Sequence, residues 1–198
     1  MAAAVAGSAY GVPSGEYLPT NVGQRVVASA GQRQAAPAVR VPQILVPPAS
    51  RPHAIPARLR IPAIGMDAPV ESLGLAADGT LQQPSGWQVA GWYRGSVRPG
   101  DVGPSIIIGH VDSVNGPAVF FRLRQLRPGQ QVTVVGRDDQ PVTFVVDQVA
   151  SYPKSSFPVG AVYGPSSVPE LRLVTCTGDF DYAARSYLDN LVVSAHLA

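Results

Sequence analysis

The sequence contains little cysteine, lysine and charge. Cys176 is the only cysteine, so the chain forms no internal disulfide and is not a disulfide-stapled scaffold. Only 14% of the 198 residues are charged, the formal net charge is +2, and the basic residues are scattered arginines plus the single Lys154. Without a basic cluster among aromatic residues, the composition argues against a nucleic-acid-binding protein.

Long helices and phosphate-binding loops are also missing. No stretch of the chain has the helical apolar period over about 12 residues, and the glycines form neither G-x-G-x-x-G nor a Walker pattern. Short alternating segments separated by turn signals are present instead. They predict strands at 58–61, 68–73, 105–109, 131–135, 142–149, 171–176 and 190–195, with a short helical piece within 120–126. This spacing predicts an all-β fold, a closed antiparallel β-barrel of seven or eight strands with one or two helical turns.

The first 56 residues differ from the rest and predict two regions. Residues 1–50 hold four charged residues and neither phenylalanine nor tryptophan. Such a segment buries too little apolar surface to offset its ordering entropy, so residues 1–56 are expected to be a disordered Ala/Pro/Gly-rich linker. Within it, the prolines of residues 41–48 favour an extended strap over the domain. Residues 57–198 are expected to form the barrel.

No membrane anchor is visible in the sequence. Residues 1–7 are like the end of an apolar segment, but they are too short to span a bilayer and lack the basic flank of a signal peptide. The sequence leaves open whether an anchor precedes them or the protein is not exported.

The lone thiol stands at a predicted strand end. Cys176 closes the strand at 171–176, and a Thr-Gly-Asp turn follows, where a side chain opens toward a cleft. A thiol becomes a nucleophile when a nearby cation favours the thiolate. His110 follows the apolar strand at 105–109, and Arg185 is the only arginine or lysine after Cys176. These three side chains are the predicted catalytic set; a buried cysteine and a structural histidine are the alternative.

Four further side chains are candidates for supporting or substrate-binding roles. Asp112 follows His110 closely enough to orient the imidazole, or it is an ordinary turn residue. Thr175 precedes the nucleophile and points to the opposite face of the strand, which favours packing or support. Phe157 and Tyr163, in a predicted loop at 151–164, suit an apolar groove for a peptide, or they pin a surface loop.

Five segments resemble, in order, the signature segments of sortases, closest to the class F branch. They are residues 59–70, 109–113 (Gly-His-Val-Asp-Ser), 118–129, 171–176 (Leu-Arg-Leu-Val-Thr-Cys) and 187–193 (Tyr-Leu-Asp-Asn-Leu-Val-Val). One position departs from the pattern, because Leu188 stands where related sequences often carry a basic residue before Asp-Asn. Arg185, three residues earlier, is the remaining candidate there.

The resemblance implies a closed β-barrel and a cysteine transpeptidase. Such an enzyme cleaves a Leu-Pro-x-Thr-Gly-type sorting signal between Thr and Gly through a thioester, and transfers the protein to a cell-wall amine. Its implied partners are sorting-signal peptides and a cell-wall precursor, at the extracellular face of a Gram-positive membrane. No cofactor and no metal are expected.

Three other functions compete with this one. A noncatalytic extracellular β-barrel binding module would leave Cys176 unreactive. An L,D-transpeptidase-like enzyme would also use a thiol and a histidine, but Val-Thr precedes the thiol here rather than Ser-x-Gly. A zinc site from His110, Asp112 and Cys176 has suitable ligand types but only three ligands of weak spacing.

Overall fold

A computed structural model of the chain describes residues 53–198. The predicted strap at 41–48 and nearly all of the predicted linker lie outside these residues. At the start of the described part, His53 hydrogen-bonds Asp101 through its backbone N–H and its ring Nδ1, at 3.0 and 2.8 Å, and its carbonyl accepts a hydrogen bond from Arg98. Across 53–198, no helix is long and apolar enough to cross a bilayer.

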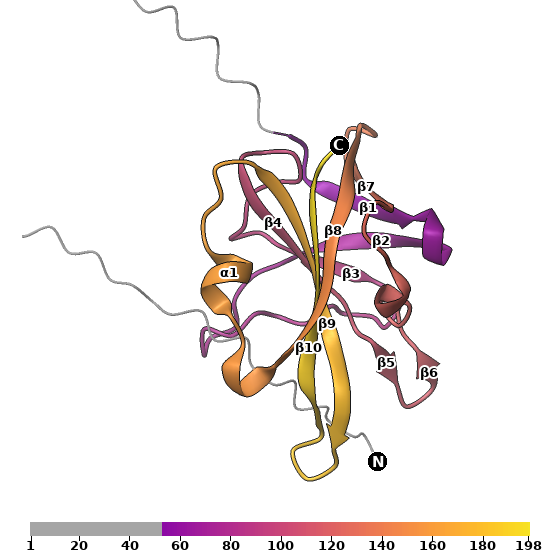
Figure 1. Cartoon of the computed structure of the whole chain (residues 1–198), viewed down its shortest axis with the longest axis vertical. Helices are drawn as coiled ribbons and strands as arrows, with labels where there is room; N and C mark the ends of the chain where they lie inside the picture. The colour runs from indigo at the N-terminus through magenta and orange to yellow at the C-terminus, as the bar shows by residue number, and fades with distance from the viewer. Residues whose placement is uncertain (1–52) are drawn as a thin grey trace, which may run out of the picture. The chain divides into compact units, whose positions relative to one another are not determined.

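Eight strands close into one barrel in the order β1-β2-β3-β4-β9-β10-β8-β7, with β7 returning to β1 (Figure 1). These strands are β1 (Pro56–Ile61), β2 (Met66–Leu73), β3 (Ala90–Tyr93), β4 (Gly103–Ile108), β7 (Gln131–Gly136), β8 (Pro141–Pro153), β9 (Pro169–Asp181) and β10 (Ser186–Leu197). The predicted closed barrel is therefore confirmed. The short β5 (Asp112–Ser113) and β6 (Gly116–Pro117) form a separate two-stranded sheet.

The barrel is mixed rather than purely antiparallel. β2 pairs with β3 in parallel, and β4 pairs with β9 in parallel, while the other neighbours are antiparallel. A parallel pair needs a long connection, and β4 reaches β9 only after the chain has formed β5 to β8. Local alternation does not reveal such a long-range pairing, so the sequence did not predict it.

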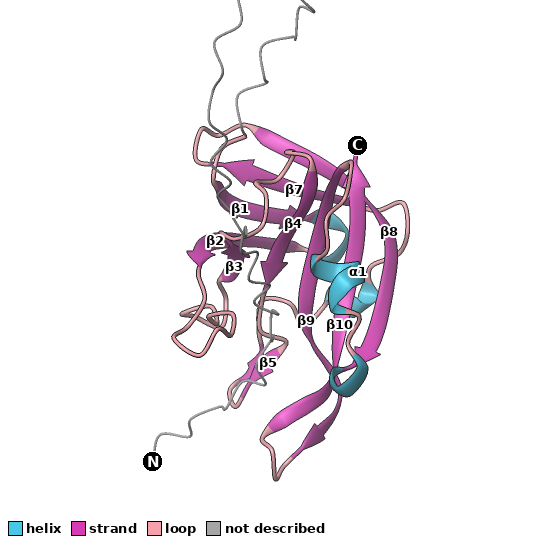
Figure 2. Cartoon of the chain, turned by 90° about the vertical axis from the view of Figure 1, so that its left-hand side faces the viewer, coloured by secondary structure: helices cyan, strands magenta, loops and turns pink. Residues whose placement is uncertain are grey.

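Two apolar clusters lie on the two faces of the barrel wall. The first fills the interior with residues from all eight strands, including Leu59, Ile107, Phe144, Leu173 and Val193. The second lies on the outer face of β4, β9 and β10, and includes Ile108, Val174, Val192 and Val162. α1 (Val159–Tyr163) covers this outer cluster beside β9 and β10, as Figure 2 shows.

Other elements are short. The 3-10 turns are η1 (Pro62–Ile64), η2 (Leu123–Gln125) and η3 (Lys154–Ser156), and η2 lies within the helical piece expected at 120–126. Part of the loop expected at 151–164 is helical, because buried Val162 anchors α1 to the outer cluster. β3 was not predicted, since Ala-Gly-Trp-Tyr has no alternation. Gly91 fits there because a Cβ would overlap the buried side chain of Leu73.

Candidate active site

The register of two parallel strands brings Cys176 and His110 together. Ile108 of β4 pairs with Val174 of β9. Both belong to the outer apolar cluster, and residues of equal parity share a face of a strand. Continuing the register by two residues puts His110 beside Cys176 on that face, about one strand spacing apart, or ~5 Å. His110 follows the end of β4, whereas Cys176 lies within β9, which continues to Asp181 instead of turning after Cys176 as the sequence predicted.

A buried hydrogen bond fixes this strand end. Thr175 is 1% exposed, and its Oγ1 donates to the carbonyl of Gly109 at 2.8 Å. The backbone N–H of Gly109 donates to the carbonyl of Val174 at 3.2 Å. Thr175 therefore lies within the wall, on the face opposite the half-buried Cys176, where it braces the residue before His110.

Aromatic and carbonyl contacts orient His110. Its ring lies 4.6 Å from the ring of Trp87, centroid to centroid, and its Nε2 is 3.3 Å from the carbonyl oxygen of Pro84. Both partners come from the connection between β2 and β3. Trp87 is 39% exposed and so forms part of the rim of the site. No feature of the sequence predicts the contact between Trp87 and His110, because the two residues are 23 positions apart and no local pattern joins them.

Asp112 bonds a tyrosine rather than the imidazole. The hydroxyl of Tyr187, on β10, donates to Oδ2 of Asp112 in β5. The Tyr187 ring also packs edge-on against Phe180, with the centroids 5.1 Å apart. Burial, then the hydrogen bond to Asp112, then the charges of Asp112, Cys176 and Tyr182 raise the pKa of Tyr187 to about 12. The phenol is therefore protonated at neutral pH and serves as the donor.

Tyr187 was not singled out from the sequence as a site residue. It lies in the 187–193 segment, but a tyrosine on a strand has no local feature that marks it as functional. The charge of Cys176 is one of the smaller causes that raise the pKa of Tyr187. The hydrogen bond to Asp112 spans 75 positions of sequence, so only the fold reveals it.

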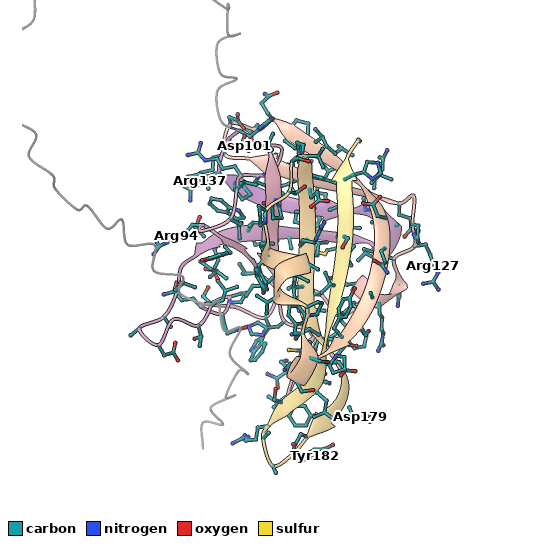
Figure 3. The ribbon with its side chains drawn as sticks, turned by 60° about the vertical axis from the view of Figure 1, so that its left-hand side comes forward. Arg94, Asp101, Arg127, Arg137, Asp179 and Tyr182 are labelled. Atoms are coloured by element: carbon teal, nitrogen blue, oxygen red, sulfur yellow. The ribbon has the colours of Figure 1, made fainter. Side chains whose placement is uncertain are left out.

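Arg185 lies at the exposed tip of the β9–β10 hairpin, in a left-handed conformation with φ of 51°. Asn190 is the β10 residue that pairs with Cys176, and Arg185 is five residues farther along the hairpin. At about 3.3 Å per residue, this puts Arg185 roughly 15 Å beyond the level of the thiol. Figure 3 shows the labelled Asp179 and Tyr182 on the same projecting hairpin, at the end opposite Asp101.

Other cations near these elements are engaged elsewhere. Arg172 pairs with Glu170 at 2.8 Å, and Arg122 donates to the carbonyl of Ile64 at 3.4 Å. Lys154 donates to the hydroxyl of Ser186 at 2.8 Å, below the hairpin tip. The strand register thus puts His110 level with Cys176, while these three cations each bond another group.

Phe157 and Tyr163 lie against the outer cluster that also contains Val174. Their ring centroids are 6.3 Å apart, and Phe157 packs edge-on against Tyr152 at 6.1 Å. The Tyr163 hydroxyl is buried and finds no hydrogen-bond partner within residues 53–198. Burial raises the pKa of Tyr163 well above its ordinary value. These aromatic side chains therefore form an apolar wall on the face from which Cys176 emerges.

The zinc alternative gains no support from the side-chain geometry. In the part of the chain that the structure describes, no three His, Cys, Asp or Glu side chains gather as a metal site. Asp112 is turned to Tyr187 instead.

Comparisons with known proteins agree with the fold. A family model described as a sortase domain matches residues 59–198. Sortase C-1 of Actinomyces oris has a similar structure, with a TM-score of 0.57 and 20% identity over 72% of this chain and 73% of that chain. Comparison with curated proteins gives no match.

Two more solved structures are similar. Sortase A of Corynebacterium diphtheriae has a TM-score of 0.56 and 21% identity over 76% of this chain and 63% of that chain. Sortase C1 of Streptococcus agalactiae has a TM-score of 0.54 and 25% identity over 72% of this chain and 66% of that chain. The present chain thus spans just under two thirds of these two relatives. The sortase-domain match covers the whole barrel from β1 to β10 except its first three residues, and this chain belongs to the sortase family.

Proposed function

We propose that the protein is a cysteine transpeptidase in which Cys176 is the nucleophile and His110 the general acid and base. The observation that carries this proposal is the parallel pairing of β4 with β9, which aligns Ile108 with Val174 and so brings the next residues of equal parity together. A half-buried thiol beside an imidazole suits attack on a carbonyl.

The reaction divides into two halves. The Cys176 thiolate attacks the threonine carbonyl of a sorting signal, and His110 protonates the departing amine, leaving a thioester. An incoming amine then attacks the thioester and restores the thiol. Backbone N–H groups next to Cys176 are candidates to bind the developing oxyanion, and one such donor typically contributes about 10²- to 10³-fold in rate.

The sequence supplies the finer assignments within this proposal. The motifs resemble class F sortases, although the solved structures compared above are named as sortases A and C. A Leu-Pro-x-Thr-Gly-type signal fits the aromatic wall of Phe157 and Tyr163. A cell-wall amine is the proposed acceptor, and the extracellular face of the membrane is the proposed location. Arg185 stays a sequence prediction for the third catalytic group.

The decisive experiment uses the single thiol. A fluorogenic Leu-Pro-x-Thr-Gly peptide should be cleaved by the wild type, and intact-protein mass spectrometry should detect the thioester adduct. Cys176→Ala should abolish both, and His110→Ala should lower turnover by at least about 100-fold.

The control is reversible blocking of the wild-type thiol with a methylthiolating reagent, followed by dithiothreitol. Activity should vanish and return, because the chain has no other cysteine to be modified. Retained turnover in Cys176→Ala would end the transpeptidase proposal. An unreactive thiol together with tight peptide binding would favour the noncatalytic binding module instead.

A further inference from the structure

The pair formed by Asp112 and Tyr187 spans the strand that carries the nucleophile. The sheet order is β4-β9-β10, Asp112 lies beyond the end of β4, and Tyr187 lies on β10. Their hydrogen bond therefore passes across β9, near the stretch from Cys176 to Phe180, since Tyr187 pairs with Phe180. Figures 1 and 2 show β5 and the β9–β10 hairpin extending from the same end of the barrel.

Once this bond is made, the pair offers only acceptors. A phenol has a single proton, and Tyr187 donates it to Oδ2 of Asp112. The phenol oxygen keeps its lone pairs, and the carboxylate keeps its second oxygen. A ligand that completes the pair must therefore be a hydrogen-bond donor.

The charge of Asp112 further restricts the kind of ligand that the pair can bind. Its hydrogen-bond partner is a neutral phenol, and among residues 53–198 no Lys, Arg or His side chain pairs with this carboxylate as an ion pair. A carboxylate near Cys176 disfavours the thiolate, so it does not assist the first half of the reaction. The same charge favours a cationic donor in the second half, when the thiol is a neutral thioester.

We propose that the Asp112–Tyr187 pair binds the incoming amine of the second half-reaction, in its ammonium form, next to the thioester on Cys176. This inference rests on the proposed transpeptidase function. The ammonium donates hydrogen bonds to the second Asp112 oxygen and to the Tyr187 oxygen, and both residues are half-buried.

The chemistry balances through His110. The bound ammonium loses one proton to become the free amine, and His110 passes that proton to solvent. The amine nitrogen then attacks the thioester carbonyl, so that a C–N bond forms and the C–S bond breaks. The second nitrogen proton passes through His110 to the Cys176 sulfur, which leaves as the restored thiol.

The test separates the two half-reactions. Acylation is measured as the single-turnover rate of thioester formation with the sorting peptide, and aminolysis as kcat/KM for triglycine. An α-amino group has a pKa of about 8, so triglycine is mostly cationic at pH 7. Tyr187→Phe and Asp112→Asn should each lower kcat/KM for triglycine by about tenfold or more. The acylation rate should stay within about threefold of wild type. Because aminolysis is slower in these variants, a larger share of the thioester should be hydrolysed by water.

Hydroxylamine supplies a second readout because it is uncharged at neutral pH. Asp112→Asn removes the charge but keeps an acceptor oxygen, so its use of hydroxylamine should fall much less than its use of triglycine. The matched controls are Tyr182→Phe and Asp179→Asn, which change the same groups at exposed positions of the same hairpin. Both should leave aminolysis unchanged, and thermal melting should verify that every variant is folded.

Three results would overturn the proposal. Aminolysis that is unchanged in both variants would show that the pair does not bind the amine. A loss confined to acylation would show that it binds a peptide N–H of the sorting signal instead. An equal loss of kcat/KM for triglycine in Asp179→Asn would show that the effect comes from the general negative charge of the surface. None of these resembles failure of the proposed function, in which wild-type protein would form no thioester at all.

Discussion

Thr175 shows how one buried hydroxyl holds two site elements in register. Its hydrogen bond to the Gly109 carbonyl joins β9, one residue before Cys176, to the end of β4, one residue before His110. The side chain is 1% exposed, so it does not meet a substrate. Its structural contribution is to tie the position before Cys176 to the position before His110.

Replacing Thr175 by valine should expose that contribution. The shape of the side chain is nearly preserved, but the Gly109 carbonyl loses its side-chain donor. A buried polar group without a hydrogen-bond partner lowers the free energy of unfolding by about 1–3 kcal/mol. Urea unfolding should show this loss of stability, and peptide cleavage should slow as well. Thr177→Val, at a half-buried position on the same strand, should cost less than half as much. Equal stability of Thr175→Val and wild type would show that the bond is not important.

Arg185 is the residue on which sequence and structure lead to different expectations. If it binds the oxyanion, Arg185→Ala should lose at least about 100-fold in kcat/KM, or roughly 2.7 kcal/mol. Its place at the exposed hairpin tip leads us to expect a loss within about threefold, because an interaction roughly 15 Å from the thiol level contributes little. Steady-state cleavage of the sorting peptide measures the difference. A 100-fold loss, not restored by lysine, would show that the tip closes over the site.

At the scale of elements, the end of β4 has no room for a side chain before His110. A Cβ on Gly109 would lie 2.7 Å from the ring of Phe120 and 2.8 Å from Val119. Phe120 is 1% exposed and its N–H donates to the His110 carbonyl, so neither the ring nor the strand end shifts freely. The glycine before the histidine is thus a packing requirement of this strand end.

Gly109→Ala should therefore lower both stability and turnover. Overpacking of this kind lowers the free energy of unfolding by about 1–3 kcal/mol. The backbone shift that it causes occurs directly before His110. Gly160→Ala in α1 is the matched control, because a Cβ there meets nothing within 4 Å. Thermal melting and peptide cleavage should be unchanged or slightly improved in the control. Wild-type behaviour of Gly109→Ala would mean that the β4 end adjusts more easily than its packing indicates.

At the scale of the whole molecule, the barrel closes without the first 50 residues. β1 begins at Pro56, pairs with β2 on one side and with β7 on the other, and so completes the ring. The interior cluster draws on all eight strands. Cooperative stability is therefore expected to reside in the barrel.

Deleting residues 1–50 should leave the melting temperature within a few degrees, because the sequence predicts a linker with few buried contacts. Calorimetry of the full and shortened chains measures this. A large drop would show that the strap expected at 41–48 packs on the barrel. A rise in cleavage rate at equal stability would show that the segment occludes the site.

Local patterns in the sequence determined the positions of most strands and placed the histidine just after the end of β4. The expected strand end and turn at Cys176 were wrong, because β9 continues past Cys176 to Asp181 in a hairpin with β10. Alternation works here because each strand has an interior and an outer face, as in Leu171, Leu173 and Val174. The family motifs supplied the link between Cys176, His110 and a sortase-like function.

Only the tertiary structure decided which strands are neighbours and what surrounds the thiol. The parallel pairing of β4 with β9, the contact of Trp87 with His110 and the bond of Tyr187 to Asp112 join residues far apart in the sequence. A register shift between Tyr187 and Asp189 and the length of the hairpin fixed where Arg185 lies. Such contacts depend on chain closure and strand register, which no short window of residues encodes.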